Sequence, residues 1–277
     1  LLFAVHPLHA EAVVGIVGRA ELLAALFSLL AYRIWLDAER DRSTPLAVAS
    51  AGLWLLGVLS KESALALPLM LLAHRTGVLA PASLSRRVRP GDAAWPAALL
   101  AAMALRAHAL GGLAVPHTSW IDNPLVLQDP LRRFMSAWGV LCRQCLQMLT
   151  GTGLSADYSY AQVAPGPALY LAGIIPLVLL AIALTWVLRR GRFRAEGWGV
   201  AFFLAFWMIT SNMFVPINTV QADRLLYLPL LGLGVAAAAS VARISGRGIR
   251  SHLAPAILVL AVLGFGARSA IRAHEWR

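Results

Sequence analysis

The polar residues of this 277-residue chain gather in a few short segments between long apolar runs. HPLHAEAV carries His6, His9 and Glu11, and SKES carries Lys61 and Glu62. Three further segments, WIDNP, LSADYSY and NTVQADRLLYLP, supply the remaining candidates: Asp122, Asn123, Asp157, Tyr158, Asn218, Asp223, Arg224 and Tyr227. An ionisable group is costly to place in an apolar region, so these residues are the first candidates for function.

Taken together, these residue types are suited to recognising an anionic headgroup. Ammonium and guanidinium groups clamp a phosphate, while carboxylate and imidazole groups can hold a divalent metal or act as a base on a hydroxyl. Lys61 is the single lysine among 24 basic residues, and its compact point charge is suited to a phosphate contact. P-loop, GxGxxG and GxSxG motifs are missing from the sequence, so soluble nucleotide chemistry and an α/β-hydrolase have no support.

The first two segments also have structural explanations. His6 and His9 can simply hydrogen-bond the end of a helix, and their spacing differs from the HExxH pattern of zinc proteases. Lys61 and Glu62 can be a mutually neutralising ion pair, or interfacial residues whose charged ends reach outward to water. The sequence leaves these alternatives open.

Two further pairs have structural explanations of the same kind. Asp223 and Arg224 can cap the helix that is expected to start at Leu225. Cys142 and Cys145 are too few for a disulfide framework. They are explained most simply as small apolar residues on the buried face of a helix, with a redox or metal role as the alternative.

Composition places all these residues in a membrane protein. Hydrophobic residues make up 59% of the chain and charged residues 13%, and apolar runs near 20 residues long recur. Such a chain is expected to be all-α, a polytopic helical membrane protein rather than a soluble domain. The net charge of +11 comes from arginines clustered between the apolar runs, which is typical of topology determinants and gives no support to a nucleic-acid partner.

The apolar runs predict the membrane spans and the arginine clusters predict their orientation. The expected spans are 22–34, a divided segment at 46–73, 93–110, 169–188, 198–215, 225–242 and 253–265. The connections at 33–42, 74–92, 189–194 and 243–250 are rich in arginine and are therefore expected on the cytoplasmic side. Segment 46–73 must then cross twice, as two short helices or a re-entrant pair with Lys61 and Glu62 at its outward turn.

The same parity places regions 6–21, 111–167 and 212–224, and with them every polar segment, on the outward side. Within the long connection, apolar residues recur at helical spacing opposite Arg132, Arg133, Arg143 and Gln147. This pattern predicts an amphipathic helix lying on the outer membrane interface.

The beginning of the sequence indicates a fragment. Leu1 already lies inside an apolar run, and no initiating methionine precedes it. We therefore expect residues 1–267 to be part of a multi-span membrane domain whose first helices and first outer loop precede Leu1. Residues 268–277 are expected to form the junction to a following region.

Four motifs resemble those of a known family. FAVHPLHAEAVVGIVGRAELLAALF, LLGVLSKESALALPLML, DNPL with LSADYSY, and ADRLLYLPLLGLG follow the same order as in the transmembrane and tetratricopeptide-repeat (TMTC) family of GT-C-type O-mannosyltransferases. The resemblance covers essentially the whole chain. The closing RSAIRAHEWR is similar to the junction at which that family passes into outward-facing tetratricopeptide repeats.

The resemblance implies a GT-C-like fold with its active site on the lumenal or periplasmic face. The donor would be a polyprenyl-phosphate-linked mannose in the membrane, and the acceptor would be a Ser or Thr hydroxyl of a protein. The usual catalytic acid of such enzymes lies in the first outer loop, which would precede Leu1. The membrane would be that of the endoplasmic reticulum or, as the arginine-rich composition favours, a bacterial inner membrane.

The resemblance also implies roles for individual residues. His6, His9 and Glu11 would be catalytic and border the donor phosphate or a divalent Mg or Mn ion. Lys61, Glu62 and Arg224 would bind the donor phosphate. The rest of the pocket would be formed by Arg19, Asp122, Asn123, Asp157, Tyr158, Asp223 and Tyr227.

A non-enzymatic membrane protein is the competing hypothesis. A transporter should carry its ionisable groups near the middle of the bilayer and often shows paired halves with broken helices, whereas here the charges cluster on one side. A membrane anchor needs no polar cluster at all. Neither class should consume a sugar donor, so a transfer assay separates both from the enzyme.

The role proposed for Lys61 predicts a measurable loss of activity. Replacing Lys61 with alanine should lower mannose transfer by roughly 100-fold or more if its phosphate contact is worth about 3 kcal/mol in the transition state. The assay follows radiolabelled mannose in intact protein. An unchanged rate would remove Lys61 from the mechanism.

Overall fold

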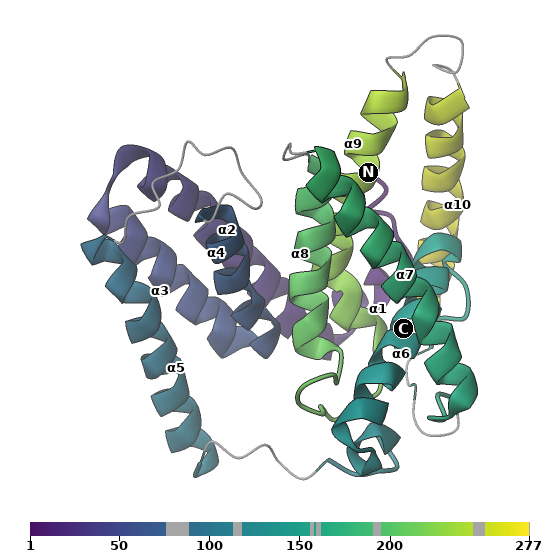
Figure 1. Cartoon of the computed structure of the whole chain (residues 1–277), viewed down its shortest axis with the longest axis horizontal. Coiled ribbons are helices and arrows are strands. Elements are labelled where there is room, and N and C mark those ends of the chain that lie inside the picture. Colours follow the sequence, from purple (N-terminus) through teal and green to yellow (C-terminus); the bar gives the residue numbers. More distant parts are fainter. Residues whose placement is uncertain are drawn as a thin grey trace. The chain divides into compact units, whose positions relative to one another are not determined.

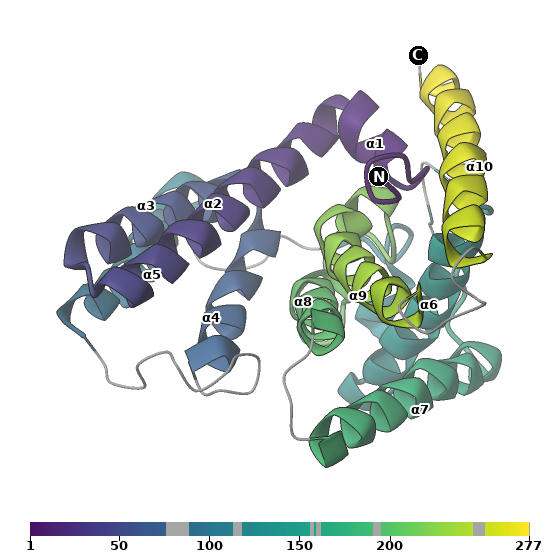
Figure 2. The same ribbon diagram turned by 90° about the horizontal axis from the view of Figure 1, so that it is seen from above.

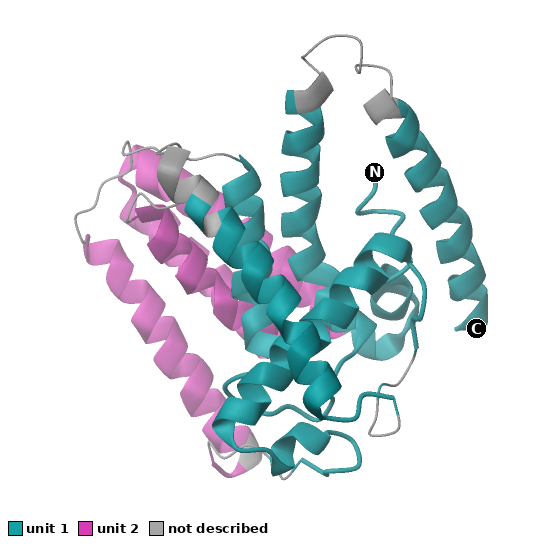
Figure 3. Cartoon of the chain, turned by 45° about the vertical axis from the view of Figure 1, so that its right-hand side comes forward, with its two compact units in different colours: residues 1–19, 118–277 teal, residues 20–117 magenta. Residues whose placement is uncertain are grey.

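The computed structural model describes residues 1–75, 89–112, 118–155, 158, 162–190, 195–245 and 253–276. Over these ranges every regular element is a helix and no strand occurs, which confirms the all-α expectation. The chain divides into two compact units (Figure 3), unit 1 with residues 1–19 and 118–277 and unit 2 with residues 20–117. The GT-C-like arrangement stays a prediction.

Unit 2 is built around α3. Its elements are α2 (Arg19–Asp41), α3 (Thr44–Ser60), η2 (Glu62–Ala66), α4 (Leu67–Arg75), η3 (Pro90–Ala93) and α5 (Ala94–Leu110). Helix α3 packs against α5 (Figure 1), and the Ser50 hydroxyl on α3 donates to the Ala31 carbonyl on α2 at 2.6 Å. This bond satisfies a buried hydroxyl between the two helices.

The expected division of segment 46–73 occurs at Lys61. Helix α3 ends at Ser60, and Lys61 has an extended backbone with φ −160° and ψ 143°. The following turn is held in place because the Trp54 indole N–H donates to the Ala64 carbonyl at 2.8 Å. The sequence-based break is therefore confirmed, and it leaves Lys61 and Glu62 between two helical segments.

An ion-pair cluster joins the ends of α2, α4 and η3. The Arg75 guanidinium pairs with the buried Glu39 carboxylate, and it binds both Asp92 oxygens at 2.6 and 2.8 Å. Arg89 approaches Glu39 at 3.8 Å. Arg75 and Arg89 therefore hold this unit together, in addition to the topological role that the sequence predicts; Arg86 and Arg87 lie outside the described residues.

Unit 1 is a set of paired helices. Its elements are α1 (His9–Val14), η1 (Ile16–Gly18), η4 (Pro124–Leu127), α6 (Pro130–Thr150), α7 (Pro167–Arg190), α8 (Ala195–Thr210), η5 (Asp223–Leu226), α9 (Tyr227–Ser245) and α10 (Leu253–Glu275). Helices α6 and α7 form one close pair, α8 and α9 another, and α10 contacts α1 and α9. Viewed from above, α1 lies beside α10 near the chain's N-terminus (Figure 2). Trp138 and Trp207 meet in the core with ring centroids 5.3 Å apart.

Two helices of the described part are long and apolar enough to cross a membrane. They cover Asp223–Arg243 and Ala256–Glu275, with mean hydropathies of 2.0 and 1.7. Three shorter apolar helices cover Thr44–Ser60, Pro167–Ala183 and Ala195–Thr210. The expected spans are thus helical over most of their length, while their sidedness stays a prediction.

The expected amphipathic helix forms as α6, but its apolar residues are divided between two environments. Trp138 and Leu141 are buried in the core of unit 1, whereas Leu131, Leu146 and Leu149 are exposed. The internal contact follows from close packing on α7, where Gly139 lies against the Leu169 backbone. An interfacial position for the exposed residues stays a prediction.

The α8–α9 pair depends on two glycines that face each other. A Cβ added to Gly199 would lie 2.3 Å from the Gly232 carbonyl oxygen, and one added to Gly232 would lie 2.4 Å from the Gly199 carbonyl oxygen. Because both neighbours are backbone atoms, neither can move away without separating the helices. Small residues are the usual means by which apolar helices approach this closely.

This contact predicts that Gly199→Val destabilises unit 1 by about 3 kcal/mol or more, because the branched side chain must force α8 and α9 apart. Thermal unfolding of the purified protein in detergent measures the change. Gly264→Ala is the matched control, since its added Cβ meets nothing within 4 Å and alanine favours a helix. Equal stability of the two variants would contradict the packing argument.

Candidate functional site

The candidate site of unit 1 is centred on η5, where Asp223 and Arg224 point their side chains toward different partners. Ala222 is extended, with φ −150° and ψ 142°, and the chain then turns into the 3-10 segment that precedes α9. Asp223 is fully buried, and the Arg224 side chain is 23% exposed. The predicted cap of the helix near Leu225 therefore exists as a turn, but both side chains are used in tertiary contacts.

Arg224 is held by Glu11 from the first helix. Its backbone N–H donates to Glu11 Oε2 at 2.9 Å, and its guanidinium pairs with Glu11 Oε1. The Glu11 side chain is only 3% exposed. A buried carboxylate that receives both an N–H and a guanidinium is well compensated for lost hydration, so Glu11 fixes the direction of the Arg224 side chain.

Asp223 is held by a phenol and a second guanidinium. The Tyr158 hydroxyl donates to Asp223 Oδ1 at 2.7 Å, and Arg272 donates to Oδ2 at 3.2 Å. Burial raises the pKa of Tyr158, and the neighbouring Asp223 carboxylate raises it further. Tyr158 is consequently a neutral phenol that donates its proton to the hydrogen bond.

Residues of α6 and of the segment before η5 surround this pair. The Tyr158 hydroxyl accepts from the Gln147 amide at 3.2 Å, and Gln147 in turn accepts from Gln221 at 2.5 Å. The Arg143 guanidinium lies 5.2 Å from the centre of the Tyr158 ring, a cation–π distance. Sequence analysis recognised Gln147 and Arg143 only as the polar face of a helix, and nothing local to Gln221 distinguishes it.

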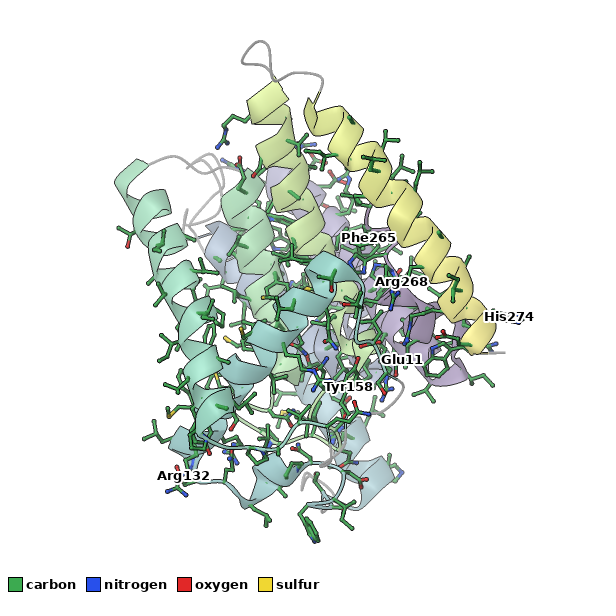
Figure 4. The ribbon with its side chains drawn as sticks, turned by 90° about the vertical axis from the view of Figure 1, so that its right-hand side faces the viewer. Glu11, Arg132, Tyr158, Phe265, Arg268 and His274 are labelled. Carbon is green, nitrogen blue, oxygen red and sulfur yellow. The ribbon has the colours of Figure 1, made fainter. Side chains whose placement is uncertain are left out.

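Helix α10 contributes contacts that the sequence did not predict. Arg272 donates to the Leu154 carbonyl at 3.1 Å in addition to Asp223. One turn earlier, Arg268 donates to the Gly151 carbonyl and Ser269 donates to the Val5 carbonyl. Figure 4 shows Arg268 on the side of α10 that faces Glu11 and Tyr158. The polar end of the chain, expected to be a junction, is helical through Glu275 and docks onto unit 1.

The two histidines next to Glu11 serve as packing groups. His6 Nε2 is 2.8 Å from the Met148 carbonyl near the end of α6, and His6 Nδ1 accepts from the Leu8 N–H at 3.3 Å. The hydrogen bond to a helix end that was one explanation of these histidines is therefore confirmed for His6. Burial lowers its pKa.

His9 lies in an aromatic surrounding. Its ring centroid is 4.4 Å from that of Phe3 and 4.7 Å from that of Tyr227. Burial, followed by the neighbouring His6, lowers the pKa of His9 to about 3. At neutral pH His9 is therefore uncharged, and it is too weak a base to deprotonate an alcohol efficiently.

The described part of unit 1 offers no fitting divalent-metal site. No group of three or more His, Cys, Asp or Glu side chains with ligand geometry occurs among the described residues. Glu11 and Asp223 are each compensated by a guanidinium, and His6 uses both ring nitrogens. The residues present thus do not fit the Mg or Mn ion that the resemblance allows.

Unit 2 contains Lys61 and Glu62. The sequence allowed an ion pair between these two residues, but each of them pairs with a different residue. Lys61 lies 3.6 Å from Glu21, whose other oxygen accepts from the Ser63 hydroxyl at 2.9 Å. Glu62 instead binds Arg106 at 2.8 Å. Glu21 is a buried carboxylate that sequence analysis missed, although its position in GRAELL between two apolar runs was a usable signal.

The other predicted residues lie apart from the Asp223 network or outside the described residues. Asp122 and Arg19 are exposed. Asn123 is fully buried and donates to Asn212 at 2.8 Å, so it braces a loop. Asp157 lies outside the described residues.

The cysteines of α6 fit the simple structural explanation. Both thiols are free and half-buried. Burial raises the pKa of Cys145 to about 11, and Cys142 adds to the effect. The Cys145 thiol is therefore protonated at neutral pH, which suits neither a nucleophile nor a metal ligand.

Comparison with known proteins gives the family context of this network. Over the whole chain, the sequence is 27% identical to mouse protein O-mannosyl-transferase TMTC4 and 25% identical to a protein O-mannosyl-transferase of Caenorhabditis elegans. A 32-residue stretch is 72% identical to human protein O-mannosyl-transferase TMTC1, over 12% of this chain and 4% of that protein. The resemblance to the TMTC family is confirmed.

The similarity covers the whole of this chain but only part of each relative. The chain spans 42% of the mouse protein and 38% of the nematode protein, about two fifths of each. No family model and no solved structure matches the chain. The TMTC relatives therefore identify the part of such a protein that this sequence resembles, and the activity of the whole is a matter for a proposal.

The burial of His9 predicts a dependence of stability on pH. Between pH 6.5 and about 3 the unfolded chain binds a proton at His9 that the folded chain does not bind. The free energy of unfolding should therefore fall as the pH falls, by up to about 1.4 kcal/mol per pH unit from this residue. Thermal unfolding at pH 7 and pH 5 should show a smaller difference for His9→Gln than for the unmodified protein. Identical pH dependence of the two proteins would contradict the burial of a neutral imidazole.

Proposed function

We propose that the chain is the membrane part of a protein O-mannosyltransferase. It would move mannose, or a similar sugar, from a polyprenyl-phosphate donor to Ser or Thr hydroxyls of acceptor proteins on the lumenal or periplasmic side. The observation that supports this proposal most is the Arg224 guanidinium, which Glu11 orients at the edge of a buried charged network. The mannosyltransferase names of the relatives, which cover the whole chain, agree with it.

The proposed reaction is a direct displacement at the anomeric carbon of the sugar. The acceptor oxygen forms a bond to this carbon while the bond to the phosphate oxygen breaks, and the electron pair leaves with the lipid phosphate. The acceptor proton passes to a carboxylate that the resemblance places in an outer loop before Leu1. Charge develops on the leaving phosphate, so a cation fixed in advance beside it lowers the barrier.

Arg224 is the residue of unit 1 best placed to supply this cation. Its side chain is 23% exposed, against 9% for Arg272. Its Nε is buried and has no hydrogen-bond partner among the described residues. Because Glu11 holds one edge of the guanidinium, the group loses little freedom when it meets a phosphate. The role of Glu11 is then to orient Arg224, since its carboxylate is already engaged.

In unit 2 we propose that Lys61 is likewise a cation that a carboxylate orients for contact with a phosphate. Glu21 holds the ammonium at 3.6 Å, and the Lys61 side chain is 26% exposed. A compact ammonium held by one carboxylate can still donate to a phosphate through its other N–H groups. Glu62 carries a negative charge and is bound to Arg106, so it is suited to organising cations and poorly suited to contacting a phosphate itself.

The decisive experiment is transfer of radiolabelled mannose from a polyprenyl-phosphate donor to protein by the full-length enzyme. Arg224→Gln should lower this transfer roughly 100-fold, as expected when an interaction of about 3 kcal/mol with the leaving group is lost. Arg132→Gln is the matched control, because Arg132 is an exposed arginine whose partner Asp129 is also exposed. Its transfer rate should stay within about two-fold of the unmodified protein, in line with the small worth of surface ion pairs.

Two results would count against the proposal. If the unmodified protein transfers no mannose from the lipid donor, a membrane anchor or a transporter becomes the better description. If transfer occurs but Arg224→Gln and Arg132→Gln behave alike in folded protein, the enzyme exists and its phosphate contact lies elsewhere.

A further inference from the structure

Arg272 is the most deeply buried arginine of the unit 1 network, and the proposed reaction gives it no role. It is 8% exposed, lies near the end of α10, and reaches Asp223 at 3.2 Å and the Leu154 carbonyl at 3.1 Å. Within the part of the chain that the structure describes, its Nε has no hydrogen-bond partner. An arginine is expensive to bury, so its presence beside the candidate site calls for an explanation.

The charges of the network offer a reason for the burial of Arg272. Glu11 and Asp223 are both buried and close enough for their charges to interact. Each is matched by one guanidinium, Glu11 by Arg224 and Asp223 by Arg272. With these four groups ionised, their charges balance and each carboxylate has a guanidinium partner. Arg143 adds a further positive charge near Asp223.

Loss of Arg272 would change this balance at a specific place. Asp223 would keep the hydrogen bond from the Tyr158 hydroxyl and the weaker attraction of Arg143, and an ion pair broken on one side leaves an uncompensated buried charge. Its immediate neighbour along the chain is Arg224. An ionised Asp223 would then repel Glu11 and attract Arg224, so two carboxylates would share this guanidinium.

We propose that Arg272 is a positioning residue of the candidate site: by pairing with Asp223, it keeps Asp223 from competing with Glu11 for Arg224. The direction of the Arg224 side chain thus depends on the ion pair between Arg272 and Asp223. This extends the proposed function, because Arg224 is the group assigned there to the donor phosphate, although the pairing itself can be tested without any transfer activity.

Helix α10 is also held by contacts that do not involve Arg272, and a change to one of these contacts can serve as a control. Arg268 donates only to a backbone carbonyl, that of Gly151, and Ser269 to that of Val5. Phe265 packs edge-on against His6 with centroids 4.6 Å apart. Changing Arg268 should therefore loosen α10 without leaving a buried carboxylate unpaired.

The first test measures coupling by thermal unfolding of the full-length protein in detergent. The interaction between Glu11 and Arg224 is obtained from Glu11→Gln, Arg224→Gln and the double variant, in the presence of Arg272 and again with Arg272→Gln. The coupling in melting temperature should fall by at least half in the Arg272→Gln background. It should return when Asp223→Asn is added, because the competing carboxylate is then removed, and it should persist with Arg272→Lys.

The second test measures donor binding through kinetics. Arg272→Gln should raise the KM for the lipid donor about ten-fold and leave the KM for the acceptor protein unchanged, and adding Asp223→Asn should reverse most of the rise. Arg268→Gln should lower the melting temperature with an unchanged donor KM. A purely structural arginine would reduce the amount of active protein and leave both KM values as they were.

The outcomes separate the two proposals. If the Glu11–Arg224 coupling is the same with and without Arg272, or if Asp223→Asn does not restore it, the positioning role is wrong. If the unmodified protein shows no transfer, the proposed function fails, and the unfolding experiment still decides whether Arg272 positions Arg224.

Discussion

The compensation of buried charge is the constraint on which the structure of unit 1 depends. Glu11 and Asp223 are withdrawn from water, and each would destabilise the fold by several kcal/mol if left alone. Their guanidinium partners come from η5 and α10. The buried charges are therefore compensated only when α1, η5 and α10 pack against one another. Replacing such pairs with apolar residues is often neutral or stabilising, so stability alone does not explain why these groups are charged. The proposed role, in which these carboxylates orient guanidinium groups toward a phosphate, would explain it.

Unit 2 follows the same principle with different groups. Glu39 gathers Arg75 and Arg89 at one end of the unit, and Glu21 gathers Lys61 and the Ser63 hydroxyl around the break between α3 and η2. In both places the carboxylate is the buried partner and the cation is the more exposed one. A cation held in this way is fixed in direction.

The histidines show how burial changes the meaning of a motif. HPLHAEAV reads as a cluster of general bases and metal ligands, but His6 caps a helix end and His9 is a neutral ring among aromatics. Only Glu11 of the three enters the charged network. In the proposed reaction, unit 1 would contribute oriented guanidinium groups, and the proton transfer would fall to a carboxylate outside this network.

The sequence by itself determined the helical class, the break at Lys61 and the segments that carry polar groups, because hydrophobic periodicity and the cost of a buried charge are properties of short stretches. It also determined the resemblance to the TMTC family through the order of its motifs. Only the tertiary structure decided which charges meet. Glu11 and Arg224 are 213 positions apart, Lys61 pairs with Glu21 rather than with its neighbour, and Arg272 pairs with Asp223, 49 positions away. An ion pair needs two groups within a few ångströms of each other in water-poor surroundings, and that distance is set by helix packing, which no local pattern records.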